Sequence, residues 1–157
     1  MDAVTIAINN MNNPLLTQLS VFLDNSLYFL LLVFVLLLIF ERNDKKRTKL
    51  MAAIFLALVF SSLIKIAIGT PRPCEELNLR TDCSQGYSFP SNHTIVAFTL
   101  ALGFLDNKKF VLFLIFAVFI AITRIYLGVH TFLDVTASMT LSPIVYEIVD
   151  YYWRRIK

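Results

Sequence analysis

The residues that could do chemistry fall into three short clusters of an otherwise apolar chain. In the last cluster, His130 and Asp134 are four residues apart, so on a helix they would share one face. A carboxylate placed there can accept the proton of one imidazole nitrogen and leave the other free to attack an electrophile. Arg124, just upstream, could offer a bidentate fork to an anionic oxygen. The cluster predicts nucleophilic attack on an anionic group. A His–Asp pair alone could equally be a structural hydrogen bond.

The middle cluster is Pro90-Ser91-Asn92-His93, and it begins a predicted helix. Ser91 can cap this helix, and the free N–H groups of its first turn form a potential anion site. His93 in that turn could protonate a leaving oxygen. A serine at a helix start is, by itself, an ordinary cap. The chain has two histidines in all, and the clusters contain both of them.

The first cluster brings two cations towards the end of a predicted helix. Lys65 and Arg72 are seven residues apart, which is two turns if the helix continues that far. Pro71 and Pro73 end the helix and stiffen the backbone that carries Arg72. Two cations at one level can neutralise phosphate oxygens as their charge changes. The simpler interpretation is that each side chain snorkels to the membrane surface.

The elements that must position these clusters are apolar helices. Of the 157 residues, 57% are hydrophobic and only 16% are charged, whereas an average globular domain is about half apolar and a quarter charged. Several apolar runs approach the roughly 20 residues that cross a bilayer. We therefore predict a single membrane-embedded domain over 1–157, an all-α bundle with about five transmembrane helices. The expected spans are 26–40, 50–69, 91–105, 110–127 and 130–149, the last bent at Pro143.

The segment before the first span is more polar. Residues 2–13 are rich in Asn and are expected to form a loop or a frayed end. Asn13-Pro14 then has the pattern of an N-cap followed by proline at the first helical position. Apolar residues recur at helical spacing over 14–24, as in a helix that lies in the membrane interface. The same segment could instead be the leading end of the first span.

The distribution of basic residues predicts the orientation. Ten of the 14 Lys and Arg residues lie in 41–49, 106–109 and 153–157, three segments on one side of a five-span bundle. The positive-inside rule makes that side cytoplasmic. The N-terminus, the loop 70–91 and the three clusters are then at the outer face of the cell membrane. The basic residues lie at helix ends without an aromatic–basic platform, so we expect no nucleic-acid partner.

The two cysteines, Cys74 and Cys83, both lie in the predicted outer loop. In an oxidising exterior they could form a disulfide, which would stabilise the loop by about 2–3 kcal/mol in the chain-entropy model. Two free thiols are the alternative where the exterior is reducing. The acidic residues of this loop form no recognisable metal-binding pattern.

Taken together, the clusters resemble the type 2 phosphatidic acid phosphatase superfamily, which includes lipid phosphatases, glucose-6-phosphatase and vanadium haloperoxidases. The pattern of that family is K-x6-RP, then PSGH, then SR-x5-H-x3-D. Asn92 stands in place of the motif glycine and Thr123 in place of the motif serine, and neither change removes a catalytic group. The matching residues are Lys65, Arg72, Pro73, Pro90, Ser91, His93, Arg124, His130 and Asp134.

The resemblance implies a role for each position. His130 would be the nucleophile that forms a phosphohistidine, oriented by Asp134, and His93 would protonate the leaving oxygen and later activate water. The scheme requires neither a metal nor another cofactor. The phosphate would be held by Lys65, Arg72, Ser91, the backbone around Asn92, and Arg124.

The substrate is expected to be an amphiphile with an outward phosphate. The helix predicted over 92–105 would rise only about 21 Å against a hydrocarbon core of about 30 Å, so a lipid headgroup could enter laterally. Similarity to short microbial members favours a polyprenyl (undecaprenyl) diphosphate; phosphatidylglycerophosphate and phosphatidate are close alternatives.

A different class of function is a small non-enzymatic transporter or assembly protein with an anion pocket, which the intact His93, His130 and Asp134 disfavour. A vanadium-type oxidase is disfavoured by the hydropathy, and the oligomeric state is not indicated.

Overall fold

The computed structural model describes residues 1–156, and these fold into seven α-helices with one short 3-10 helix and no strand. The prediction of an all-α fold is confirmed for this part of the chain. Lys157, which we counted in the basic tail and in the single domain, lies outside the described residues. In chain order the helices are α1 (Ala3–Asn9), α2 (Pro14–Asp24), α3 (Ser26–Phe40), α4 (Asp44–Ile68), η1 (Pro73–Glu75), α5 (Asn92–Leu102), α6 (Phe110–Tyr126) and α7 (Phe132–Arg155).

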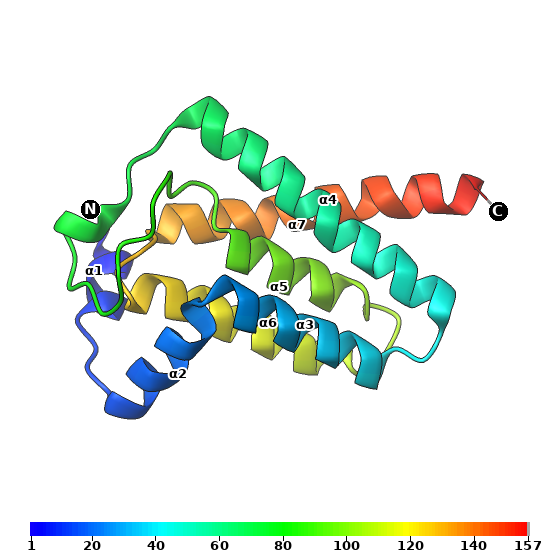
Figure 1. Ribbon diagram of the computed structural model, residues 1–157, viewed down its shortest axis with the longest axis horizontal. Coiled ribbons are helices and arrows are strands. Elements are labelled where there is room, and N and C mark those ends of the chain that lie inside the picture. The colour runs from blue at the N-terminus through cyan, green and yellow to red at the C-terminus, as the bar shows by residue number, and fades with distance from the viewer. Residues whose placement is uncertain (157) are drawn as a thin grey trace.

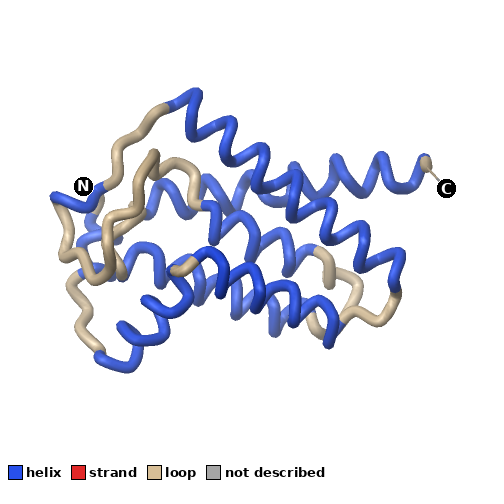
Figure 2. The backbone as a smooth tube through the Cα atoms, viewed as in Figure 1, coloured by secondary structure: helices blue, strands red, loops and turns tan. Residues whose placement is uncertain are grey.

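Helices α3 to α7 run lengthwise along the molecule and form the bundle (Figure 1). The long loop after α4 and the connection between α6 and α7 lie at one end of the bundle, and the α3–α4 and α5–α6 connections lie at the other (Figure 2). Helix α5 is the centre of the bundle and packs against α4, α6 and α7. Its residues 94–101 are all buried, which explains why this helix is apolar on every face.

Two helices, α4 and α7, are long and apolar enough to span a membrane. Helices α2 and α3 meet that test only when they are taken together, whereas α5 and α6 are apolar but have just 11 and 17 residues. Large apolar side chains point outwards from the bundle, among them Phe55 and Ile66, which are 69% and 74% exposed. Such an exterior is typical of a membrane protein. The fold thus has two or three candidate spans, and the count of five stays a prediction.

Helix α2 is separate from the first long helix. The axes of α2 and α3 differ by 87°, and Asn25 between them accepts hydrogen bonds from the N–H groups of Leu27 and Tyr28, so it caps the start of α3. A straight span over 14–40 is therefore excluded. The position of 14–24 in the membrane interface stays a prediction.

The expectation of a loop over 2–13 was wrong, because 3–9 form helix α1. The carboxylate of Asp2 caps this helix through the N–H of Thr5, at 2.8 Å. Asn9 is buried, and its amide donates to the carbonyls of Asn78 (3.1 Å) and Tyr126 (3.2 Å). These partners lie in distant parts of the chain, so local composition could not indicate that the asparagines would be ordered.

Several helix ends also differ from the predictions. Asn43 caps α4, so the helix begins six residues earlier than expected and includes most of the charged segment 41–49. Helix α5 ends at Leu102, which shortens its rise to about 16 Å. Helix α7 begins at Phe132 rather than at His130 and continues as helix through Pro143.

The long loop between α4 and α5 is fastened over one end of the bundle. Its cysteines form the predicted disulfide, with the Cα atoms of Cys74 and Cys83 6.0 Å apart. The guanidinium of Arg80 donates to the carbonyls of Tyr126 and Asn9, both at 2.6 Å. The loop therefore joins α1 to the end of α6, beside the residues of the third cluster.

Candidate active site

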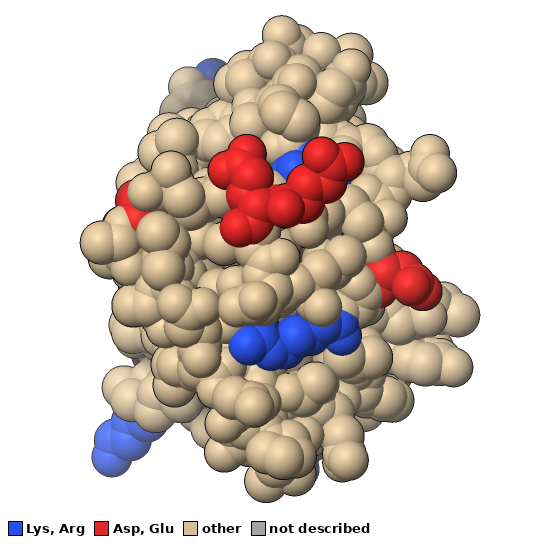
Figure 3. Space-filling view, turned by 90° about the vertical axis from the view of Figure 1, so that its left-hand side faces the viewer, with Lys and Arg blue, Asp and Glu red and all other residues tan. Residues whose placement is uncertain are grey.

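Residues from all three sequence clusters line one cavity of about 200 Å³ beneath the long loop. Figure 3 shows this end of the molecule, where few basic side chains reach the surface, as expected if the cluster cations point inwards. Segments far apart in the sequence thus converge on one site. The cavity is lined by the cluster residues Lys65, Arg72, Asn92, His93, Arg124 and His130, together with Asp24, Ser26, Ser84, Gln85 and Val129.

His130 lies in the connection between α6 and α7, with both ring nitrogens near partners. Its Nδ1 is 3.4 Å from Oδ2 of Asp134, and its Nε2 is 3.5 Å from Nη1 of Arg72. The expectation that His130 and Asp134 share a helix was wrong, because Thr131 is the N-cap of α7. Asp134 takes part in a capping box and accepts the N–H of Thr131 at 2.8 Å. The start of the helix therefore fixes the carboxylate that orients the imidazole.

The surroundings of His130 favour a neutral imidazole. Burial and the nearby Arg72 and Lys65 cations lower the pKa of His130 to about 4, although the hydrogen bond with Asp134 opposes that shift. The imidazole is then uncharged near pH 7. If Asp134 accepts the Nδ1 proton, the lone pair of Nε2 is available as a nucleophile.

His93 occupies the first turn of α5 and lines the same cavity. Its ring packs on Phe29, with a distance of 4.5 Å between the ring centroids. Its Nε2 is buried and has no hydrogen-bond partner among the described residues. An unpaired imidazole nitrogen in a polar cavity can exchange a proton with a bound molecule.

The Lys65 and Arg72 side chains reach the cavity from separate elements. Gly69, with φ of 67°, ends α4 in the left-handed conformation, so the helix does not continue to Arg72. Lys65 Nζ donates to the carbonyls of Tyr87 (3.0 Å) and Ser88 (2.9 Å). Arg72 Nη1 donates to the carbonyl of Val129 at 3.1 Å, and its buried Nε has no partner in the described part of the chain. Both cations keep N–H groups available for an anion.

Ser91 and Asn92 differ in their access to the cavity. Ser91 is the predicted N-cap of α5, but it is fully buried and does not line the cavity. Its hydroxyl accepts a hydrogen bond from the hydroxyl of Thr94 at 3.0 Å. Asn92 does line the cavity, and its Oδ1 accepts from the hydroxyl of Ser61 at 2.6 Å. Of this pair, only Asn92 is placed to meet a ligand directly.

Asp24, at the end of α2, is a cavity residue that sequence reasoning missed. Its Oδ1 accepts from Nη1 of Arg124 at 2.7 Å, and its Oδ2 accepts from the hydroxyl of Thr81 at 3.0 Å. The pair is well shielded, since the Arg124 and Asp24 side chains are 1% and 17% exposed. Asp24 therefore orients Arg124 and links α2 to the long loop. Its partner lies 100 residues away, so no local signal could identify it.

The arrangement can carry out phosphoryl transfer. A neutral histidine with a carboxylate behind it provides a nucleophile, and a second histidine provides a proton donor. Three cations around the cavity can hold and neutralise the oxygens of a phosphate. Among residues 1–156, no group of three or more His, Cys, Asp or Glu side chains is placed to hold a metal ion.

Comparisons with known proteins agree with this chemistry. The PAP2 superfamily model matches residues 46–156. Over 116 residues, which are 70% of this chain, the sequence is 33% identical to an undecaprenyl-diphosphatase of Sulfolobus acidocaldarius. The match covers 56% of that relative, so the chain spans little more than half its length.

Two crystal structures have a similar fold. Aquifex aeolicus LpxE superposes with a TM-score of 0.78 at 30% identity, covering 95% of this chain and 93% of its own. A PAP2 type phosphatidylglycerolphosphate phosphatase from Bacillus subtilis superposes with a TM-score of 0.74, covering 99% of this chain and 85% of its own. The second is only 20% identical, so that likeness concerns the fold alone.

Proposed function

Because this chain belongs to the PAP2 superfamily, we propose that it is a membrane lipid phosphatase whose preferred substrate is a polyprenyl diphosphate of the undecaprenyl type. The reaction would convert the diphosphate into the monophosphate and inorganic phosphate. The observation that carries the proposal is the convergence of His93, His130 with Asp134, and three cations on one cavity. The match to an undecaprenyl-diphosphatase supports the choice of substrate.

The proposed catalytic cycle has two steps. His130 Nε2 attacks the terminal phosphorus, the bond to the bridging oxygen breaks, and His93 gives its proton to the leaving lipid monophosphate. His93, now neutral, then takes a proton from water, which attacks the phosphohistidine and releases phosphate and the free imidazole. Lys65, Arg72 and Arg124 would stabilise the charge on the transferred oxygens in both steps.

An apolar groove beside the site supports a lipid substrate. A cavity of about 170 Å³ shares Ser26, Asn92 and His93 with the phosphate cavity. It shares Leu30 and Leu58 with a further cavity of about 220 Å³ between α3 and α4. The three cavities are thus neighbours in a row from His93 along α3, and we propose that together they form one path for the lipid. An apolar tail in this path would bury surface at about 25 cal/mol per Å², with the phosphate end next to His130.

A substrate panel tests the proposal directly. The purified protein would be assayed for kcat/KM on polyprenyl diphosphates, phosphatidylglycerophosphate, phosphatidate and a soluble phosphoester. We expect the highest kcat/KM for a polyprenyl diphosphate and the lowest for the soluble ester, because only lipids occupy the apolar path. If kcat/KM were higher for phosphatidylglycerophosphate or phosphatidate than for a polyprenyl diphosphate, that lipid would be the preferred substrate and the proposed one would be wrong. No release of phosphate from any of the compounds would favour a non-enzymatic protein with an anion pocket.

Metal independence is part of the proposal, because Lys65, Arg72 and Arg124 can neutralise the phosphate without a divalent ion. We expect kcat to be unchanged, within twofold, after dialysis against EDTA. The measurement is phosphate release before and after the treatment, with a magnesium-dependent phosphatase treated in parallel. Loss of activity that magnesium restores would show that these cations are insufficient.

The proposed site faces the outside of the cell membrane, on the strength of the positive-inside rule. A cysteine in place of the exposed Glu75 should react with a membrane-impermeant thiol reagent in intact cells. A cysteine in place of Arg155, at the opposite end of the bundle, should react only after lysis. The native cysteines form a disulfide and should give little background. Inverted labelling would place the reaction on the cytoplasmic side.

We expect Asp24 to act as a positioning residue through Arg124. In Asp24→Ala, the guanidinium loses its 2.7 Å partner, and kcat/KM should fall about tenfold to a hundredfold because displaced substrate-binding groups lose near-attack geometry. In Asp24→Asn the amide oxygen can still accept the hydrogen bond, so the loss of kcat/KM should be smaller. In this variant kcat should lie closer to its wild-type value than KM does. Glu75→Gln, which removes an exposed carboxylate at the same end, is the matched control. Equal losses in Asp24→Ala and Asp24→Asn would show that the charge of Asp24, and not its hydrogen bond, matters.

A further inference from the structure

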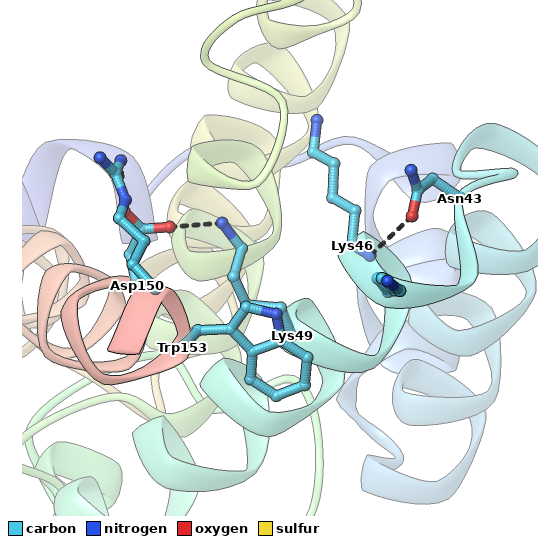
Figure 4. A pocket seen from close by; sticks show the side chains of 7 residues that line it. Asn43, Lys46, Lys49, Asp150 and Trp153 are labelled. Atoms are coloured by element: carbon cyan, nitrogen blue, oxygen red, sulfur yellow. Dashed lines mark hydrogen bonds and ion pairs between the residues drawn. The ribbon is translucent and has the colours of Figure 1, made fainter. Parts of the chain in front are cut away.

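A second polar cavity, of about 310 Å³, is shown from close by in Figure 4. The helix ends that line it lie at the end of the bundle opposite the candidate active site (Figure 1). It is formed where the beginning of α4 meets the end of α7. None of its residues takes part in the chemistry proposed above. The lining residues are Asn43, Lys45, Lys46, Lys49, Asp150, Trp153 and Arg154.

The cavity has an excess of positive charge. Four of its side chains are cationic and one is anionic. Asp150 binds two of the cations, since its Oδ1 is 2.5 Å from Nζ of Lys49 and its Oδ2 is 2.6 Å from Nη2 of Arg154. Lys45 takes part in no ion pair within the described residues, and Lys46 has a longer contact, 3.5 Å, with Glu41 outside the cavity. The cavity therefore retains cationic groups that Asp150 does not neutralise.

The backbone adds to this positive potential. Asn43 is the N-cap of the 25-residue helix α4, and its Oδ1 accepts the N–H of Lys46 (Figure 4). The first turn of a long helix carries a partial positive charge, and here that turn forms one wall of the cavity. Figure 4 shows Lys46 and Lys49 leaving the helix on the same side, so that their charges add to that of the helix end.

Neighbouring residues place the cavity at the boundary between apolar and polar surface. Tyr151 and Tyr152, next to Trp153, are exposed, and so are the apolar Met51 and Ile148 on the bundle side. Tyr and Trp side chains concentrate at the headgroup level of membranes. Basic residues at that level attract anionic lipids.

We propose that this cavity binds the phosphate of an anionic phospholipid headgroup. The cations would pair with the phosphate oxygens, Trp153 would lie at the glycerol level, and the acyl chains would run along the exposed apolar faces of α4 and α7. A free phosphate ion has the same charge chemistry, but it gains nothing from the apolar and aromatic surroundings. The proposal does not depend on the phosphatase activity, so either can fail without the other.

The single tryptophan of the chain is Trp153, so its fluorescence reports on this cavity alone. The full chain in detergent would be titrated with dihexanoyl phosphatidylglycerol, dihexanoyl phosphatidylcholine and inorganic phosphate. We expect a saturable fluorescence change with phosphatidylglycerol at concentrations at least tenfold lower than with the other two. In Lys45→Gln/Lys46→Gln, the apparent Kd for phosphatidylglycerol should rise at least tenfold.

Two further variants serve as controls. Lys108→Gln/Arg155→Gln removes the same charge from the same end of the bundle without touching the cavity lining, and its Kd should be unchanged. Lys45→Arg/Lys46→Arg keeps the charge and should bind as the wild type does, which separates loss of binding from loss of folding. Equal responses to phosphatidylglycerol and phosphatidylcholine would overturn the proposal. Saturation by phosphate alone at the same concentration, or binding that Lys45→Gln/Lys46→Gln retains, would also overturn it.

Discussion

Replacing His130 with alanine should lower kcat for a polyprenyl diphosphate by about four orders of magnitude or more. In this variant the attacking nitrogen is gone, and removal of the nucleophile of a covalent mechanism typically costs that much. KM should change far less, because Lys65, Arg72 and Arg124 remain to hold the phosphate. The measurement is steady-state release of phosphate from the lipid substrate by the purified variant.

A control is needed because His130 is buried, and its truncation leaves space. His130→Gln keeps most of the side-chain volume and a hydrogen-bonding group for Asp134, so it should retain the wild-type unfolding temperature more closely. It should nevertheless be as inactive as His130→Ala. If either variant kept more than about a hundredth of the wild-type kcat, His130 would not be the nucleophile.

The second large effect is expected for His93→Ala, and it should depend on the leaving group. With phosphatidate, a lipid monoester whose alkoxide leaving group needs a proton, kcat should fall about 10²- to 10⁴-fold, as is typical when a general acid is lost. With p-nitrophenyl phosphate, whose leaving group departs without a proton, the first step should be nearly unaffected. Hydrolysis of the phosphohistidine should still be slow, because His93 no longer activates water, so p-nitrophenolate should appear as a burst.

Rapid-mixing measurements of p-nitrophenolate release separate these two roles of His93. Phe29→Leu is a suitable companion, because it removes the ring that packs at 4.5 Å on His93 and leaves the imidazole in place. In Phe29→Leu the decrease in kcat should be smaller than in His93→Ala, and it should be the same for both substrates. If the rate of the first step in His93→Ala fell equally with both substrates, the assignment of His93 as the general acid would be contradicted.

The sequence was sufficient to predict the convergence of the clusters, because their spacing and their places at helix ends constrain them. Lys65, Arg72, His93, Arg124 and His130 do line one cavity. The apolar runs likewise predicted the existence of the long helices, and the expectation that both cysteines lie in an outer loop predicted their disulfide.

The features that sequence reasoning missed depend on contacts between distant segments. Helix α1 is held by bonds from Asn9 to Asn78 and Tyr126, and a polar run of asparagines gives no local sign of them. Asp24 acquires a role only because the 87° bend after α2 brings it to Arg124.

Local capping explains the remaining differences. Thr131, directly after His130, is the N-cap of α7, so His130 and Asp134 are held together by a helix start and not by one helical face. The hydroxyl of Ser91 is used inside the helix cap, whereas Asn92 and the cations line the cavity. In both cases the backbone around the motif residues decides which atoms reach the cavity.

The central claim, that His130 becomes phosphorylated during turnover, can be measured on His93→Ala. This variant should form the intermediate from p-nitrophenyl phosphate and hydrolyse it slowly, so the protein can be quenched in alkali and its peptides examined by mass spectrometry. We predict one phosphoryl group on the peptide that contains His130, stable in alkali and lost in acid, and absent from His93→Ala/His130→Gln. A phosphoryl group on another residue, or continued turnover with none on His130, would contradict the proposed mechanism.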